Sequence, residues 1–140
     1  MIEIASALLN SLLLVKYLQF LIPSLTVAYP IINDQDYSME FYQATEELTL
    51  NKWGIHEPMP VNPIQLNELD TFLVPLIGFD NNGHRIGYGK GYYDRYFARL
   101  DHSVKRIGIS YFEPIENVED THQFDVPLTH CITPNRIYEF

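Results

Sequence analysis

The chain has 140 residues, 46% hydrophobic and 19% charged, which predicts one packed domain over residues 1–140 rather than a disordered segment. Its net charge of −9 argues against general binding to nucleic acid, whose phosphates must be neutralised by cations. A single cysteine, Cys131, excludes an internal disulfide and fits a reducing, cytoplasmic setting.

The first predicted element is an apolar helix. Leucines and Tyr17 recur at helical spacing, which predicts a helix from about Ser6 to Phe20 that ends before Pro23. Residues 7–22 lack a basic leader and a small-residue cleavage site, and polar residues interrupt them. We therefore expect neither a signal peptide nor a membrane span.

Two candidate strands and a loop come next. The apolar run at residues 25–32 is rich in strand-forming residues and predicts a buried strand. Residues 38–48 predict a short strand that leads into a polar turn or helix. Residues 51–63 contain three prolines and are expected to form a loop.

The second half of the chain indicates a mostly parallel sheet. Residues 70–80 are apolar on both faces, as expected of a central parallel strand, and "NNG" then turns the chain. Helical spacing resumes from Tyr93, and residues 105–112 and 130–133 predict two more strands, the second being the last. Such an α/β domain binds ligands beyond the carboxyl ends of its strands, which places the candidate site directly after residues 71–79.

The stretch at that position, GFDNNGHRIGYGKGYYDRYFARL (residues 78–100), is rich in glycine and basic residues. Six of the nine Lys and Arg fall within residues 85–106, where only two acids offset them. Alternating glycines (Gly87, Gly89, Gly91) allow positive φ and the close approach of a ligand. A helix start adds partial positive charge, and Arg85 and Lys90 add full charges. The stretch therefore predicts a phosphate-binding loop.

Two familiar phosphate motifs are excluded. A Walker A loop would need glycine at His84 and Ser or Thr at Gly91, and the dinucleotide fingerprint would need glycine at Tyr92. The alternative is a plain turn whose glycines serve only geometry. Asp94 also has two readings, either an acid that favours the first turn of a helix or a Mg²⁺ ligand.

Other catalytic chemistry finds little support. The five histidines show no compact metal-ligand spacing, and no nucleophile elbow is present. Cys131 lies in a predicted strand and is expected to be a small core residue.

The segment VPLIGFDNNGHRIGYGKGYYDR closely resembles the signature of the 5-formyltetrahydrofolate cyclo-ligase family, without a gap. VAYPII, MEFYQ, WGIHEP, RIGISYFE and FDVPLTHCIT resemble other segments of that family. The resemblance covers nearly all of the chain from Leu25 onward. It implies a three-layer Rossmann-like α/β domain with a mostly parallel central sheet, of the NagB/RpiA type.

The resemblance also implies an ATP- and Mg²⁺-dependent ring closure of 5-formyltetrahydrofolate to 5,10-methenyltetrahydrofolate, with release of ADP and phosphate. In the family's scheme the formyl oxygen attacks the γ-phosphate. N10 of the folate then attacks the activated carbon, and phosphate leaves.

The functional residues implied by the resemblance fall into four groups. Lys90 and Tyr92 are the expected catalytic residues, and Asp94 and Asp125 the expected metal ligands. The expected ATP-binding residues are Arg85, Ile86, Gly87, Tyr88, Gly89, Lys90, Gly91, Tyr92 and Tyr93. The expected folate-binding residues are Glu3, Met39, Phe41, Trp53, Tyr88, Gly89, Lys90, Gly91 and Tyr92. Core packing remains an alternative role for Met39 and Phe41.

The chain departs from the family at its start. The family opens with a basic helix that helps to hold ATP and a strand, whereas this chain begins at the next segment, with Lys16 its only cation in the first 51 residues. We expect an exposed sheet edge that could be covered by self-association. The alternatives to an active enzyme are a non-catalytic nucleotide- or folate-binding fragment and an incomplete reading of the coding sequence.

Overall fold

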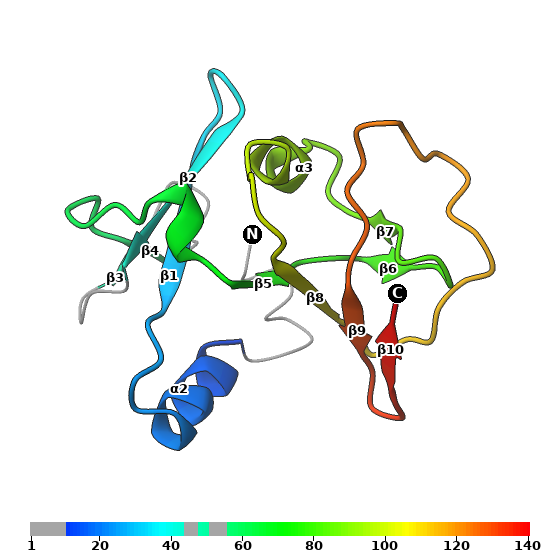
Figure 1. The fold of residues 1–140 in the computed structure, drawn as a ribbon, viewed down its shortest axis with the longest axis horizontal. Coiled ribbons are helices and arrows are strands. Elements are labelled where there is room, and N and C mark those ends of the chain that lie inside the picture. Colours follow the sequence, from blue (N-terminus) through cyan, green and yellow to red (C-terminus); the bar gives the residue numbers. More distant parts are fainter. Residues whose placement is uncertain (1–10, 44–47, 51–55) are drawn as a thin grey trace.

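The computed structural model describes residues 11–43, 48–50 and 56–140, and all structural statements below concern these residues (Figure 1). The elements in chain order are α2 (Ser11–Leu21), β1 (Ala28–Asn33), β2 (Ser38–Gln43), β3 (Leu48–Leu50), β4 (His56–Pro58), the 3₁₀ helix η1 (Leu66–Glu68), β5 (Thr71–Val74), β6 (Gly78–Phe79), β7 (Arg85–Ile86), α3 (Tyr92–Phe97), β8 (Lys105–Ile109), β9 (His130–Ile132) and β10 (Ile137–Glu139).

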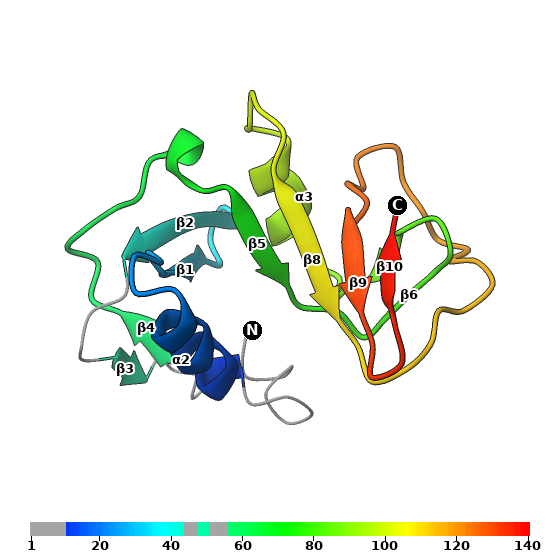
Figure 2. The ribbon, with the colours of Figure 1, turned by 60° about the horizontal axis from the view of Figure 1, so that its bottom comes forward.

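The main sheet has four strands in the order β10-β9-β8-β5, which lie side by side in Figure 2. β5 pairs parallel with β8, with Leu73 opposite Ile107, and β8 pairs parallel with β9. This confirms the mostly parallel sheet. The prediction that residues 130–133 form the last strand is wrong, because β10 follows and pairs antiparallel with β9. The three-layer arrangement stays a prediction.

Aromatic side chains pack α3 onto one face of this sheet. Alternate residues of β5 point to that face, so Phe72 is buried there. Its ring centroid lies 5.1 Å from Phe97 and 5.7 Å from Tyr96 in edge-on geometry. Phe41 of β2 lies 4.9 Å from Tyr96 and joins the same cluster. Each such pair adds about 0.5–1.5 kcal/mol beyond its burial, so this cluster fixes α3 relative to the sheet.

The first part of the chain forms peripheral elements. β1 and β2 make an antiparallel hairpin of their own, so the predicted strand at 25–32 exists but is only partly buried. Helix α2 lies on the opposite side of the main sheet from α3 (Figure 1). It ends at Leu21, close to the predicted end, while residues 6–10 of the predicted helix lie outside the described residues. No helix of the described part is long and apolar enough to cross a membrane.

The apolar run at residues 70–80 is not one central strand as predicted. β5 ends at Val74, just before Pro75, which has no N–H to donate to a sheet. The run resumes as β6, which pairs antiparallel with β7. β5 also stands at the end of the strand order in the described part of the sheet, so it is not central there.

The prediction of a loop over residues 51–63 is partly wrong. β4 pairs antiparallel with β3, with Thr49 opposite Glu57. Residues 51–55 of the predicted loop lie outside the described residues.

Candidate functional site

The glycine-rich loop runs from β7 to the start of α3 and has the predicted backbone freedom. Gly89 has φ of 81° and Gly91 has φ of 64°, values that L side chains rarely adopt. Gly87 is not among the positive-φ residues, and a Cβ placed on it would meet no atom within 4 Å. Neither backbone strain nor packing requires glycine at residue 87, whereas the positive φ of Gly89 and Gly91 fits both a plain turn and a phosphate-binding loop.

Helix α3 contributes less charge than its predicted start suggested. It spans six residues, so its dipole is small, and Gly91 caps its start in a left-handed conformation. Positive charge at this loop therefore comes from side chains.

Asp80 stabilises the turn that precedes the glycine-rich loop, and the sequence analysis missed this role. Its carboxylate is fully buried and accepts hydrogen bonds from the N–H groups of Asn82 (2.9 Å), His84 (3.0 Å) and Val118 (3.1 Å), and it lies 3.1 Å from His84 Nδ1. Burial alone would raise the pKa of Asp80, but these hydrogen bonds outweigh it and hold the pKa below its ordinary value. The Asp two residues before "NG" is the signal that could have identified this side-chain-capped turn.

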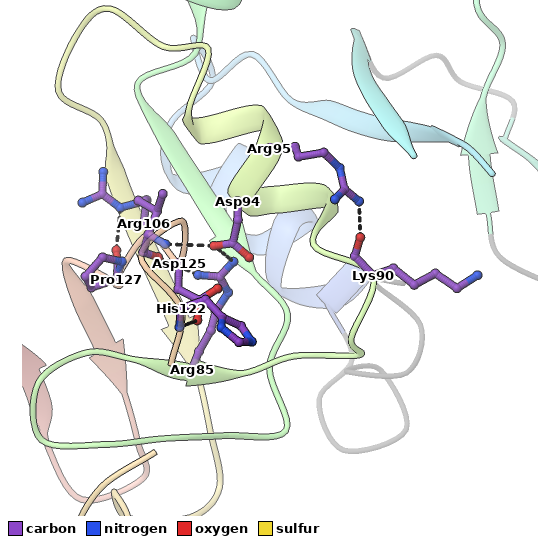
Figure 3. Close-up of polar contacts among 9 residues, drawn as sticks. Arg85, Lys90, Asp94, Arg95, Arg106, His122, Asp125 and Pro127 are labelled. Atoms are coloured by element: carbon purple, nitrogen blue, oxygen red, sulfur yellow. Dashed lines mark hydrogen bonds and ion pairs between the residues drawn. The ribbon is translucent and has the colours of Figure 1, made fainter. Parts of the chain in front are cut away.

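Arg85 and Asp94 form a partly buried ion pair. Nη2 of Arg85 donates to Oδ1 of Asp94 at 2.8 Å, and Nη1 donates to the carbonyl of Val126 at 2.6 Å. The same Asp94 oxygen accepts the N–H of Val126 at 3.0 Å. Figure 3 shows Asp94 facing Arg85 and the 122–127 loop. The guanidinium of Arg85 thus joins the start of α3 to that loop in this structure.

The two predicted metal ligands lie at the same cavity but do not form a complete metal site. Oδ2 of Asp125 accepts the N–H of His122 at 2.8 Å. Within the described residues, Oδ2 of Asp94 and Oδ1 of Asp125 accept no hydrogen bond, and no three acidic, His or Cys side chains converge as metal ligands. Mg²⁺ is typically held by one or two carboxylates with phosphate oxygens, so these residues fit the ion together with a bound nucleotide.

Most of the basic cluster at residues 85–106 has structural partners. Arg99 pairs with Glu40 at 3.0 Å, and Arg106 donates to the carbonyls of Pro127 and Val104. Arg95 donates to the carbonyls of Lys90 and Tyr37. These side chains connect the loop and α3 to neighbouring segments.

Lys90 is bound more loosely than these arginines. Its side chain is 54% exposed, and Nζ lies 3.8 Å from Asp34 Oδ1. In Figure 3 it extends away from Asp94 and Asp125. Lys90 is therefore the cation of the loop that can move to a ligand with the smallest loss of existing contacts.

A polar cavity of about 1110 Å³ borders the loop. The described part of the chain contributes three cations and five carboxylates to its lining: Arg85, Lys90, Arg95, Asp34, Asp94, Glu119, Asp120 and Asp125. The acids outnumber the bases, so a polyphosphate would need a further positive charge, such as a divalent cation, to bind here.

Asp34 reaches the site from the β1–β2 turn and was also missed by the sequence analysis. The hydroxyl of Tyr92 donates to its Oδ1 at 2.8 Å. Burial, together with this hydrogen bond, raises the pKa of Tyr92 to about 12, so the hydroxyl remains a donor near neutral pH. No local sequence pattern reports this contact, because 58 residues separate its partners.

A second, apolar cavity of about 880 Å³ adjoins the polar one, and Tyr88, Tyr93 and Pro75 line both. Among the residues that the structure describes, no charged side chain lines the apolar cavity. Phe41 lines it, whereas Met39 is a buried core residue that lines neither cavity. Glu3 and Trp53 lie outside the described residues.

Cys131 is a core residue, as expected. Its side chain is fully buried, and burial raises the pKa of the thiol to about 12.

The fold and the site define an α/β domain with a mostly parallel sheet and a glycine-rich loop beside a polar cavity. The family model of the 5-formyltetrahydrofolate cyclo-ligase family matches residues 2–134, and the chain belongs to this family. It is 34% identical over 103 residues to 5-formyltetrahydrofolate cyclo-ligase of Escherichia coli K12, with 71% of this chain and 56% of the relative covered. It is 33% identical over 118 residues to the protein of the same name from Mycoplasma genitalium, covering 83% and 62%.

A solved structure shares the fold. The NMR structure of Aquifex aeolicus 5,10-methenyltetrahydrofolate synthetase matches with a TM-score of 0.72 at 24% identity, covering 90% of this chain and 64% of that one. The chain thus spans about three fifths of the length of these proteins.

Proposed function

We propose that this chain catalyses the ATP- and Mg²⁺-dependent cyclisation of 5-formyltetrahydrofolate to 5,10-methenyltetrahydrofolate, with release of ADP and phosphate. The observation that carries the proposal is the junction of two cavities at Tyr88, one polar beside the glycine-rich loop and one apolar. Family membership supplies the reaction, and the junction offers adjoining places for a triphosphate and for aromatic rings.

The polar side of the junction suits the phosphoryl transfer. The formyl oxygen would form a bond to the γ-phosphorus as the bond to ADP breaks, and the loop would surround the transferring group. Open space at Gly87 and Gly89 lets backbone N–H groups approach phosphate oxygens closely. Lys90 supplies the mobile cation, and the Tyr92 hydroxyl supplies a hydrogen-bond donor.

The apolar side suits the folate rings. The pterin and aminobenzoyl rings would lie against Tyr88 and Phe41, with the formyl group directed to the loop. N10 would then attack the activated formyl carbon and lose its proton, while the carbon–oxygen bond breaks and phosphate departs. Holding N10 and this carbon together is the main task of the protein in that step.

Asp94 and Asp125 would hold Mg²⁺, which would supply positive charge to offset the charge on the transferring phosphoryl group. The protein itself keeps Asp94 in place through Arg85 and the N–H of Val126.

The test is product formation followed at the absorption band of the methenyl compound. Purified protein with 5-formyltetrahydrofolate, Mg²⁺ and ATP should form product, and omission of ATP should abolish it. Product formation that does not depend on ATP would overturn the proposal. Calorimetric binding of ATP without turnover would instead favour a non-catalytic nucleotide-binding fragment.

We also propose that the chain self-associates through the outer edge of β5. β5 ends the strand order in the described part of the sheet. Exposed apolar side chains such as Ile77, Tyr111 and Phe112 line the apolar cavity, which β5 also lines. Light scattering at increasing concentration should show a mass above 16.3 kDa. A constant monomer mass would contradict self-association.

A further inference from the structure

The β1–β2 turn touches the glycine-rich loop through one carboxylate. Oδ1 of Asp34 accepts the hydroxyl of Tyr92 at 2.8 Å and lies 3.8 Å from Nζ of Lys90. Tyr92 and Lys90 are the two expected catalytic residues, and both meet this one oxygen.

Arg95 makes a second connection between the turn and the loop. Its guanidinium donates to the carbonyls of Lys90 and Tyr37. It also lies over the ring of Tyr37 at 5.4 Å and near that of Tyr92 at 6.0 Å. The backbone of Lys90 is thereby tied to the turn that carries Asp34.

Asp34 differs from its polar neighbours in the turn. Oδ1 of Asn33 accepts the N–H of Gln35 at 3.0 Å, and Oδ1 of Asp36 accepts the N–H of Ser38 at 2.9 Å. These two side chains stabilise their own turn. Asp34 reaches Tyr92 and Lys90 at the loop, and formation of the turn alone does not require these two contacts.

We propose that Asp34 is a positioning residue, which holds the Lys90 ammonium and the Tyr92 hydroxyl at the mouth of the phosphate-binding loop. This inference rests on the proposed function for its kinetic consequences. An exposed lysine samples many rotamers, and a neighbouring carboxylate restricts them to those that point toward the cavity. The 3.8 Å separation is loose enough for the ammonium to move to an arriving phosphate.

The first test needs neither turnover nor ATP. Lysines are dimethylated with ¹³C-formaldehyde, and the methyl signals of Lys90 and Lys105 are compared by NMR. Lys105 is exposed on β8 and serves as the internal reference. In Asp34→Asn the Lys90 signal should shift and narrow toward that of Lys105. In the matched control Asp36→Asn it should stay unchanged. An unchanged Lys90 signal in Asp34→Asn overturns the proposal.

The second test uses steady-state kinetics with ATP varied. Asp34→Asn should lower kcat/KM for ATP about tenfold, as expected for the loss of one charged contact that orders a cation. Asp34→Glu should recover it to within about threefold, and Asp36→Asn should match wild type. In a Lys90→Ala background, Asp34→Asn should change kcat/KM less than about twofold, because asparagine keeps an oxygen that accepts the Tyr92 hydroxyl. Equal losses of kcat/KM in both backgrounds, or a higher kcat/KM for ATP in Asp34→Asn than in the wild type, overturn the proposal.

The two tests separate the inference from the function on which it rests. If the wild-type chain forms no product, the proposed function fails, and the NMR comparison still decides whether Asp34 holds Lys90. If the wild-type chain is active and Asp34→Asn is indistinguishable from it in both tests, only the inference fails.

Discussion

Replacing Asp80 by asparagine should be among the most damaging single changes in the second half of the chain. The buried carboxylate accepts N–H groups from three residues and contacts a histidine ring, with two contacts on each oxygen. Asparagine keeps one of the two oxygens and places an NH₂ group where the other oxygen accepted its two hydrogen bonds. Losing two hydrogen bonds to a charged acceptor, at about 1.5–3 kcal/mol each, predicts a loss of about 3–6 kcal/mol in the free energy of unfolding.

The assay is urea denaturation followed by circular dichroism from pH 3 to 8. Because the pKa of Asp80 is lowered in the folded state, its contribution is fully present above the unfolded pKa of about 4. It is lost as the pH falls through the lower folded pKa. Asp80→Asn should lose this acid-dependent part of the stability. Asp101→Asn, whose side chain is 92% exposed, is the control and should change stability by less than about 0.5 kcal/mol. A loss below about 1 kcal/mol for Asp80→Asn at pH 7 would refute the reasoning.

Three other predictions follow from the same structure. Lys90→Ala should lower kcat/KM for ATP about a hundredfold without changing the urea midpoint, whereas Lys105→Ala should stay within about twofold; equal effects would remove Lys90 from the mechanism. Arg85→Lys cannot bridge Asp94 and Val126 with a planar fork and should cost about 1–3 kcal/mol in urea denaturation, and an unchanged midpoint would contradict this. Cys131 should react with a thiol reagent at pH 8 only after unfolding, because its thiol is buried with a pKa of about 12; rapid native labelling would disprove that placement.

Local patterns predicted the turn at residues 81–83 and the left-handed conformations of Gly89 and Gly91, since each follows from a few neighbouring residues. The parallel pairing was predicted from the alternation of strands and helices along the chain. The break at Pro75 can also be read from the sequence, because proline cannot donate to a central strand, although apolar residues continue on both sides of it.

The roles of Asp34 and Asp80 could not be read in full from local sequence. Asp80 caps a turn that the sequence shows, yet its contact with Val118 joins segments 38 residues apart. The contact of Asp34 with Tyr92 spans 58 residues. The partner of Arg85 was hidden for a similar reason, because folding places the arginine against Asp94 and the 122–127 loop. Its contact with a phosphate stays a prediction.

The most direct test of the central claim is the stoichiometry of ADP and 5,10-methenyltetrahydrofolate formed by this chain. Both products are measured in one reaction, for wild type and for Lys90→Ala. The wild type should release one ADP for each methenyl product, and the variant should show a large and equal loss of both. ADP release without methenyl product, or methenyl product without ADP, would contradict the coupling of the two cavities in one reaction.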